Sequence, residues 1–195
     1  MNDKIFLQPD RDATSDWLKS YYFARAAVAV VWFAAAFTIG KTSPSIAAAL
    51  LVAYPAYDAL ANFADARRNG GLKLNRSQAI NVAVSLVAMI AVAAAVTRDL
   101  HAVMAVFGAW AILAGLLQLV TGVRRWELGA QWGMILAGAQ SAIVGAYFIQ
   151  QALGTAAVGI ADIAPYAAFG ALYFFVSAVW LTVAQARRRV ARRAA

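Results

Sequence analysis

Six long apolar runs limit what this chain can fold into more than any other feature of its sequence. Each run has about the 20 mostly apolar residues that a helix needs to cross the hydrocarbon core of a bilayer. Short polar segments such as GKTSP and RRNGGLKLNRSQ separate the runs, which cover roughly residues 21–39, 44–66, 78–97, 101–123, 130–151 and 165–185. The sequence therefore predicts an all-α integral membrane protein with six transmembrane helices.

The composition agrees with a bilayer location and excludes several kinds of chemistry. Hydrophobic residues make up 63% of the chain and charged residues 13%, whereas a soluble domain has about half and a quarter. The chain has no cysteine and a single histidine, His101, which excludes disulfides, thiolate metal sites and multi-histidine metal sites. No phosphate-binding glycine loop, HExxH or GxSxG motif occurs. We therefore expect a non-enzymatic protein with no catalytic, cofactor-binding or metal-binding residues.

The basic residues predict how the chain is oriented. All but Lys41 and Arg98 of the 17 lysines and arginines fall in the N-terminal stretch, in the 67–77 and 124–129 segments, or in the C-terminal tail. Lysine and arginine concentrate in cytoplasmic loops, so both termini should be cytoplasmic. This topology also explains the net charge of +8 without a nucleic-acid partner, and none is expected.

The same charges divide the chain into three parts. We expect a polar cytoplasmic segment over residues 1–20, a six-helix domain over 21–186 and a basic cytoplasmic tail over 187–195. The bilayer is the expected partner throughout. The arginines of the tail are, in addition, candidates for contact with anionic lipid headgroups.

Particular residues mark the expected helix ends. Ser43 followed by Pro44 is typical of an N-cap and a first helical residue, and Pro165 occupies a similar place before the last span. Asp99 is a candidate cap for the fourth span.

Aromatic residues near the expected cytoplasmic face predict an interfacial belt, because amphipathic rings prefer the headgroup level. These residues are Trp17, Tyr21, Tyr22, Trp126 and Trp132.

The even-numbered spans end alike, which indicates an internal repeat. They close with DARR, GVRR and QARRR at residues 65–68, 122–125 and 185–189. We interpret the chain as three copies of a helical hairpin, over residues 21–68, 78–125 and 130–188. Each copy would begin and end in the cytoplasm, so the repeats are parallel rather than inverted as in many secondary transporters.

Several segments, in order, resemble the HdeD-like short-repeat family of bacterial inner-membrane proteins, a domain family of unknown function. They are DWLKSYYFARAAVAVVWF, TSP, VAYPAYDALANFADARR, WAILAGLLQLVTGVRRW and MILAGAQSAIVGAYF. The chain departs where the family often has Arg-Gly, since Arg25 is followed by Ala26. The resemblance implies a six-helix inner-membrane protein, and one family member links the family to acid resistance.

A carboxylate inside the second span is the leading candidate for a functional residue. Asp58 lies roughly 12 Å inside the helix end, where a charge costs about 2.5–3.5 kcal/mol on insertion scales. Tyr54, Asp58 and Asn62 share one helical face because they are four residues apart, and Tyr57 adjoins them. One hypothesis is a proton- or cation-responsive site. The other is a structural carboxylate that is hydrogen-bonded to tyrosines or paired with an arginine.

Arg25 is the natural partner for Asp58, because it lies about one turn inside the first span from the same side. The alternative is that its side chain snorkels to the headgroups. Our hypothesis is an Arg25–Asp58 pair. The candidate intramembrane polar cluster is therefore Arg25, Tyr54, Tyr57, Asp58 and Asn62.

Small residues recur every seven positions on the fourth and fifth spans and predict close helix packing. This packing could lie within the chain or in a homo-oligomer. The candidate packing residues are Gly108, Gly115, Gly122, Gly138, Ser141 and Gly145.

Two glutamines at membrane depth, Gln118 and Gln140, are predicted to be buried amides. They would form hydrogen bonds between helices or line a polar cavity.

Two hypotheses for function follow from these residues. The first is a non-enzymatic inner-membrane protein of the HdeD-like kind, acting in envelope or acid-stress tolerance through lipid or partner contacts. The alternative is a small channel or transporter for protons, ions or a small solute that uses the Asp58/Arg25 cluster. A water-filled cavity reaching Asp58 would favour the second hypothesis, and a sealed carboxylate the first. An enzyme acting on lipid is the least favoured class.

Overall fold

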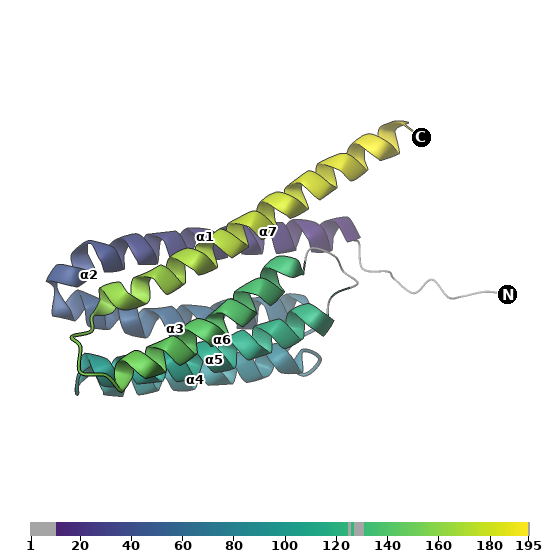
Figure 1. Cartoon of the computed structure of the whole chain (residues 1–195). Coiled ribbons are helices and arrows are strands. Elements are labelled where there is room, and N and C mark those ends of the chain that lie inside the picture. The colour runs from purple at the N-terminus through teal and green to yellow at the C-terminus, as the bar shows by residue number, and fades with distance from the viewer. Residues whose placement is uncertain (1–10, 125, 127–130, 195) are drawn as a thin grey trace.

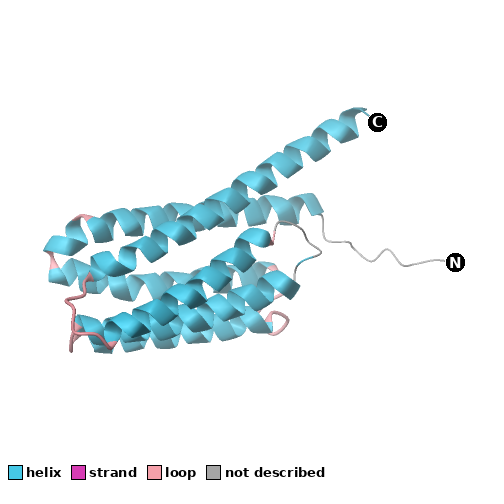
Figure 2. Cartoon of the chain, in the orientation of Figure 1, coloured by secondary structure: helices cyan, strands magenta, loops and turns pink. Residues whose placement is uncertain are grey.

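A computed structural model of the chain describes residues 11–124, 126 and 131–194, and these fold into helices (Figures 1 and 2). The elements are α1 (Arg11–Phe37), α2 (Ile39–Thr42), α3 (Pro44–Arg68), α4 (Arg76–Val96), α5 (Leu100–Arg124), α6 (Trp132–Ala152) and α7 (Ile160–Ala194). Six helical segments are long and apolar enough to cross a membrane, with α1 and α2 together forming the first. The predicted all-α fold with six spans is confirmed.

The outermost parts of the chain are more helical than the sequence suggested. α1 begins at Arg11, inside the segment expected to be a polar extension, and α7 continues through the basic tail to Ala194. Extending an existing helix avoids the cost of nucleation, and the Ala/Arg-rich tail has high helix propensity. Residues 1–10 lie outside the described part of the chain.

The start of α7 corrects the prediction that Pro165 is a first helical residue. The helix begins at Ile160, and Pro165 lies inside it. The Asp162 carboxylate accepts a hydrogen bond of 2.7 Å from the Gly159 N–H group, which satisfies a donor just before the first turn. Pro165 therefore removes one helical hydrogen bond near the helix end, where that loss is least disruptive.

The other two predicted helix ends are confirmed. Ser43 is the N-cap of α3, where its hydroxyl accepts a hydrogen bond from the Ile46 N–H group at 3.4 Å and Pro44 is the first helical residue. The Asp99 carboxylate accepts a hydrogen bond from the Ala102 N–H group at 2.7 Å.

The six spans form a closed ring. Each packs against its neighbour in the chain, and α1 packs against α7 to close the ring. The most extensive contacts join α5 to α6, α1 to α7 and α3 to α4. These pairs link different predicted hairpins rather than the two helices of one hairpin, and the three-copy repeat stays a prediction. The start of α1, the end of α7 and the α3–α4 connection lie at the same end of the bundle (Figure 1).

Apolar side chains cover both the centre and the outside of the ring. The main buried cluster includes Trp32, Leu51, Val92, Phe107 and Ile163. Large apolar side chains are also exposed on the outer faces of the helices, among them Val31, Leu60, Val87, Leu113, Ile143 and Trp180. Exposed apolar faces on six spanning helices are suited to contact with lipid. The chain is a multi-pass membrane protein.

Glycines explain the close packing of α5 against α6. A Cβ atom added to Gly115 would lie 2.6 Å from the Gly138 carbonyl oxygen, and one added to Gly138 would lie 2.6 Å from the Gly115 carbonyl oxygen. Gly108 and Gly145 are related in the same reciprocal way, at 2.7 and 2.6 Å. The two backbones are in direct contact, so the predicted glycine faces serve packing within the chain.

Part of the predicted aromatic belt is wrong. The Tyr22 side chain is 2% exposed and packs inside the bundle against Phe174, and Tyr21 joins the polar network described below. Trp126 and Trp132 are exposed and contact each other edge to face. Tyr21 turns inward because the buried Arg25 offers its hydroxyl a hydrogen-bond partner, and Tyr22 because its ring joins a buried apolar cluster.

Candidate functional site

A cavity lined by both polar and apolar side chains lies inside the helix ring. Its volume is about 80 Å³, and a buried water needs about 10–15 Å³ of such space, so it has room for several waters. The cavity is partly open, and all six spans contribute to its lining. Its lining begins at Ser77 and Thr121, at the end of the bundle where α7 terminates. It reaches Tyr54 and Trp110 in the middle of the bundle.

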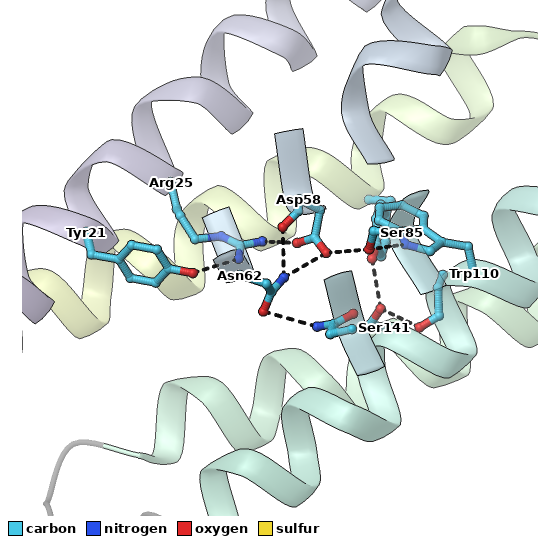
Figure 3. A network of polar contacts seen from close by, with 10 residues as sticks. Tyr21, Arg25, Asp58, Asn62, Ser85, Trp110 and Ser141 are labelled. Atoms are coloured by element: carbon cyan, nitrogen blue, oxygen red, sulfur yellow. Dashed lines mark hydrogen bonds and ion pairs between the residues drawn. The ribbon is translucent and has the colours of Figure 1, made fainter. Parts of the chain in front are cut away.

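Asp58 lies on the wall of this cavity and is held by three different side chains (Figure 3). One carboxylate oxygen forms the ion pair with Arg25 at 2.5 Å. The other accepts hydrogen bonds from Ser85 Oγ at 2.9 Å and Asn62 Nδ2 at 3.0 Å. The residue is only 8% exposed, so these donors replace its hydration.

Arg25 reaches into the bundle rather than out to the headgroups. Its guanidinium donates to Tyr21 Oη at 3.1 Å and lies 4.4 Å from the centre of the Phe174 ring. Its side chain is 15% exposed. The predicted Arg25–Asp58 pair is confirmed, and the snorkelling alternative is wrong. An arginine suits this place because a planar guanidinium can both form several hydrogen bonds and stack on a ring.

A polar stripe on α4 completes the network, and the sequence analysis missed it. Gln78 Nε2 donates to Asp65 at 3.0 Å, Asn81 Nδ2 donates to Asn62 Oδ1 at 3.3 Å, and Ser85 binds Asp58. The signal was available, because residues three and four apart on a helix share a face. These polar residues are unusual within an otherwise apolar span.

Trp110 on α5 extends the network to a fourth helix. Its indole N–H donates to Ser85 Oγ at 3.0 Å, so one serine links the carboxylate of Asp58 to the indole (Figure 3).

The two tyrosines of the predicted cluster have a different role from the expected one. Tyr54 and Tyr57 both line the cavity. Among the described residues, neither is hydrogen-bonded to Asp58. Tyr54 packs against the rings of Trp32, Trp110 and Tyr166, with centroids 4.7, 5.9 and 6.2 Å away. Of the two alternatives for a structural carboxylate, the structure shows the pairing with an arginine. It shows no bond from these tyrosines, because the aromatic cluster turns Tyr54 towards other rings.

The candidate amides and the serine of α6 also reach the cavity. Gln118 and Gln140 are half-buried rather than buried as predicted, and both line the cavity, which agrees with the second of the two roles predicted for them. Ser141 Oγ donates to the Ala111 carbonyl oxygen at 2.8 Å and is 2.8 Å from Tyr166 Oη. Ser141 thus joins helix packing to the cavity wall.

A second cavity enters the bundle from the opposite end. Its volume is about 410 Å³, and its lining includes Lys41, Asp99 and the buried side chains of Leu51 and Ile160. Leu51 lines this outer cavity, whereas Tyr54 lines the inner one. Three helical residues span about 4.5 Å. The two cavities therefore approach each other to within about one turn of α3.

An apolar layer separates the two cavities. Leu51, Trp110 and Phe107 belong to one buried cluster, and Tyr54 and Tyr166 pack against it. Of these residues, Leu51 lines the outer cavity, and Tyr54, Trp110 and Tyr166 line the inner one.

No family model, curated protein or solved structure matches this chain. Its class is therefore defined by its own structure. It is a multi-pass helical membrane protein with a cavity of mixed polarity inside a ring of six spans.

Proposed function

We propose that this protein is a small channel or transporter that moves a small polar solute, an ion or protons through the centre of the ring. The observation that carries the proposal is the approach of the two cavities from opposite ends to Leu51 and Tyr54, one turn apart on α3.

The described arrangement corresponds to a closed conformation. The inner cavity has room for water, whereas the layer around Leu51 is apolar and buried. Apolar constrictions block permeation by excluding water. A small displacement of this layer would join the cavities, because only about 4.5 Å of helix separates their linings.

The polar network supports the same proposal. Ionisable residues within membrane spans are costly and commonly mark the routes of ions, protons and substrates. Here, the Arg25–Asp58 pair lies on the wall of the inner cavity rather than in a fully apolar contact. The pair would keep the polar side chains bonded to it, such as Asn62 and Ser85, in place along the route.

The test is flux through reconstituted vesicles. Leu51→Ala thins the apolar layer, and Leu60→Ala makes the same truncation on the exposed face of α3, where Leu60 is 67% exposed. We expect Leu51→Ala to raise proton or small-solute flux, measured with a pH-sensitive dye and by vesicle swelling, and Leu60→Ala to leave it unchanged. Flux equal to that of protein-free vesicles in the wild type and in both variants would reject a permeation pathway.

The Asp58→Asn variant distinguishes transport of protons from transport of other solutes in the same vesicle assay. If protons are the cargo, this variant abolishes dye acidification while solute swelling stays at the wild-type level. An unchanged dye response in Asp58→Asn would assign the route to a solute or to another ion.

The resemblance to the HdeD-like family supports a second proposal. We propose that the protein is a non-enzymatic component of a bacterial inner membrane that contributes to envelope or acid-stress tolerance, with both termini in the cytoplasm. Loss of survival in acid after gene deletion, restored by the wild-type gene, would support it. Equal survival of deletion and wild-type strains would count against it.

The long last helix supports lipid contact as part of either proposal. At 1.5 Å per residue, the 35 residues of α7 extend for about 52 Å, whereas the hydrocarbon core is about 30 Å thick. The end of α7 therefore projects from the bundle (Figure 1), with Arg187 and Arg188 exposed. Such basic helix ends attract anionic headgroups. Association of several copies through the exposed faces is proposed as well.

A further inference from the structure

We infer that the inner cavity binds a small uncharged solute of three or four non-hydrogen atoms that carries an N–H donor, with simple amides as the chemical class. This inference rests on the proposed function, since it names the class of solute for that route. It follows from the size, the charge balance and the unmet hydrogen bonds of the cavity.

The size of the cavity limits the solute. A cavity of about 150 Å³ accommodates benzene, which has six carbon atoms. The inner cavity, at about 80 Å³, is about half that volume and therefore fits about three or four non-hydrogen atoms. The rings of Tyr54, Trp110 and Tyr166 form a compact group of edge-to-face contacts on its wall.

The charge balance of the network favours an uncharged solute. Asp58 and Arg25 neutralise each other, and Asp58 already accepts from Arg25, Ser85 and Asn62. An anion would compete with Asp58 for the guanidinium, and a cation would compete with Arg25 for the carboxylate. Either would leave a buried charge without its partner, which is strongly unfavourable. An uncharged solute leaves the pair intact.

Two polar atoms of the cavity residues specify the hydrogen bonds that the solute must supply. Asn81 is 7% exposed and lines the cavity, and its Oδ1 atom is buried without a hydrogen-bond partner among the described residues. The Nε–H group of Arg25 is also buried and unpartnered there. Leaving such atoms unsatisfied is costly. A solute with an N–H donor satisfies Asn81, and a carbonyl oxygen is the matching acceptor for Arg25.

The amide group of Asn81 is fixed in this orientation by its neighbour. Its Nδ2 group donates to Asn62 Oδ1, and Asn62 in turn donates to Asp58. Exchanging the oxygen and nitrogen of Asn81 would place two amide oxygens against each other. The unpartnered atom of Asn81 is therefore an acceptor.

The experiment compares three probes of equal size on the full-length protein purified in detergent. Acetamide, acetone and acetate each have four non-hydrogen atoms. Acetone lacks the N–H donor, and acetate carries a charge. We expect saturation-transfer NMR to detect acetamide, with a dissociation constant about tenfold lower than that of acetone, equivalent to about 1.4 kcal/mol. Acetate should give no signal above the detergent blank.

Variants assign the binding to the proposed atom. Asn81→Ala removes the acceptor, and Val87→Ala makes a truncation on the exposed face of the same helix, where Val87 is 66% exposed. We expect Asn81→Ala to weaken acetamide binding about tenfold, to the level of acetone, and Val87→Ala to leave it unchanged. The three-probe comparison on the wild type requires no variant to fold.

Binding and transport fail in distinguishable ways. Equal binding of acetamide and acetone by the wild type overturns the inference, and so does tighter binding of acetate. Unchanged acetamide binding in a folded Asn81→Ala variant also overturns it. Selective acetamide binding without acetamide flux in vesicles supports the site and rejects the proposed permeation function instead.

Discussion

At the scale of single residues, Asp58 shows how a carboxylate is kept at membrane depth. Its oxygens accept hydrogen bonds from a guanidinium on α1, a hydroxyl on α4 and an amide on α3. The amide of Asn62 also donates to the Asp58 carbonyl oxygen at 2.9 Å. With these donors, the cost of removing the charge from water is offset by charge-assisted hydrogen bonds.

The ion pair makes a testable contribution to stability. Breaking a buried pair by removing one partner costs about 3–5 kcal/mol, so Asp58→Asn and Arg25→Gln should each lower the free energy of unfolding. The double variant should lose less than the sum, by about 1–3 kcal/mol, because the two residues are in contact. Reversible unfolding in mixed detergent micelles measures the cycle. Additive losses would show that the two side chains are not coupled.

At the scale of helices, the ring has two kinds of contact. α5 and α6 meet through glycines, with backbone against backbone. α3 and α4 meet through the polar side chains of the network, such as Asn62 with Asn81 and Asp65 with Gln78. The glycine contacts leave no space between α5 and α6. The polar contacts between α3 and α4 place hydrophilic side chains where they can line a cavity. The cavity therefore lies beside the polar contacts.

The glycine contacts predict a strong position dependence for a single methyl group. Gly115→Ala places a Cβ atom 2.6 Å from a carbonyl oxygen, whereas Gly170→Ala on α7 meets its nearest atom at 3.9 Å. We expect Gly115→Ala to lower stability by about 1–3 kcal/mol through overpacking and Gly170→Ala to have little effect or to stabilise its helix. Thermal unfolding in detergent, followed by circular dichroism, compares them. Equal melting temperatures would show that α5 and α6 are not in direct contact.

At the scale of the whole molecule, orientation is open to a direct measurement, because the natural chain has no cysteine. Lys73 lies between α3 and α4, and Gly154 lies between α6 and α7, at opposite ends of the bundle. If the basic end is cytoplasmic, a membrane-impermeant maleimide should label Gly154→Cys in intact spheroplasts and Lys73→Cys only after lysis. The reverse pattern would invert the predicted topology.

Much of the fold was predictable because the bilayer imposes length and polarity on each span. The six apolar runs, the cap at Ser43 and the cap at Asp99 follow from local chemistry, and the structure confirms them. The Arg25–Asp58 pair was also predictable, since two opposite charges at similar depth from the same side have few other partners. The start of α7 and the inward turn of Tyr22 were not, because each depends on neighbours that are distant in the chain.

The sequence alone determined that this chain is a six-span helical protein with one charged pair at depth. These properties depend on the composition of each segment and on its solvent. Only the tertiary structure decided that α7 closes a ring on α1, that the α4 stripe meets Asp58, and that cavities enter from both ends. Those features depend on the rotation of each helix about its own axis. That rotation is set by packing against the other helices, and no single segment encodes it.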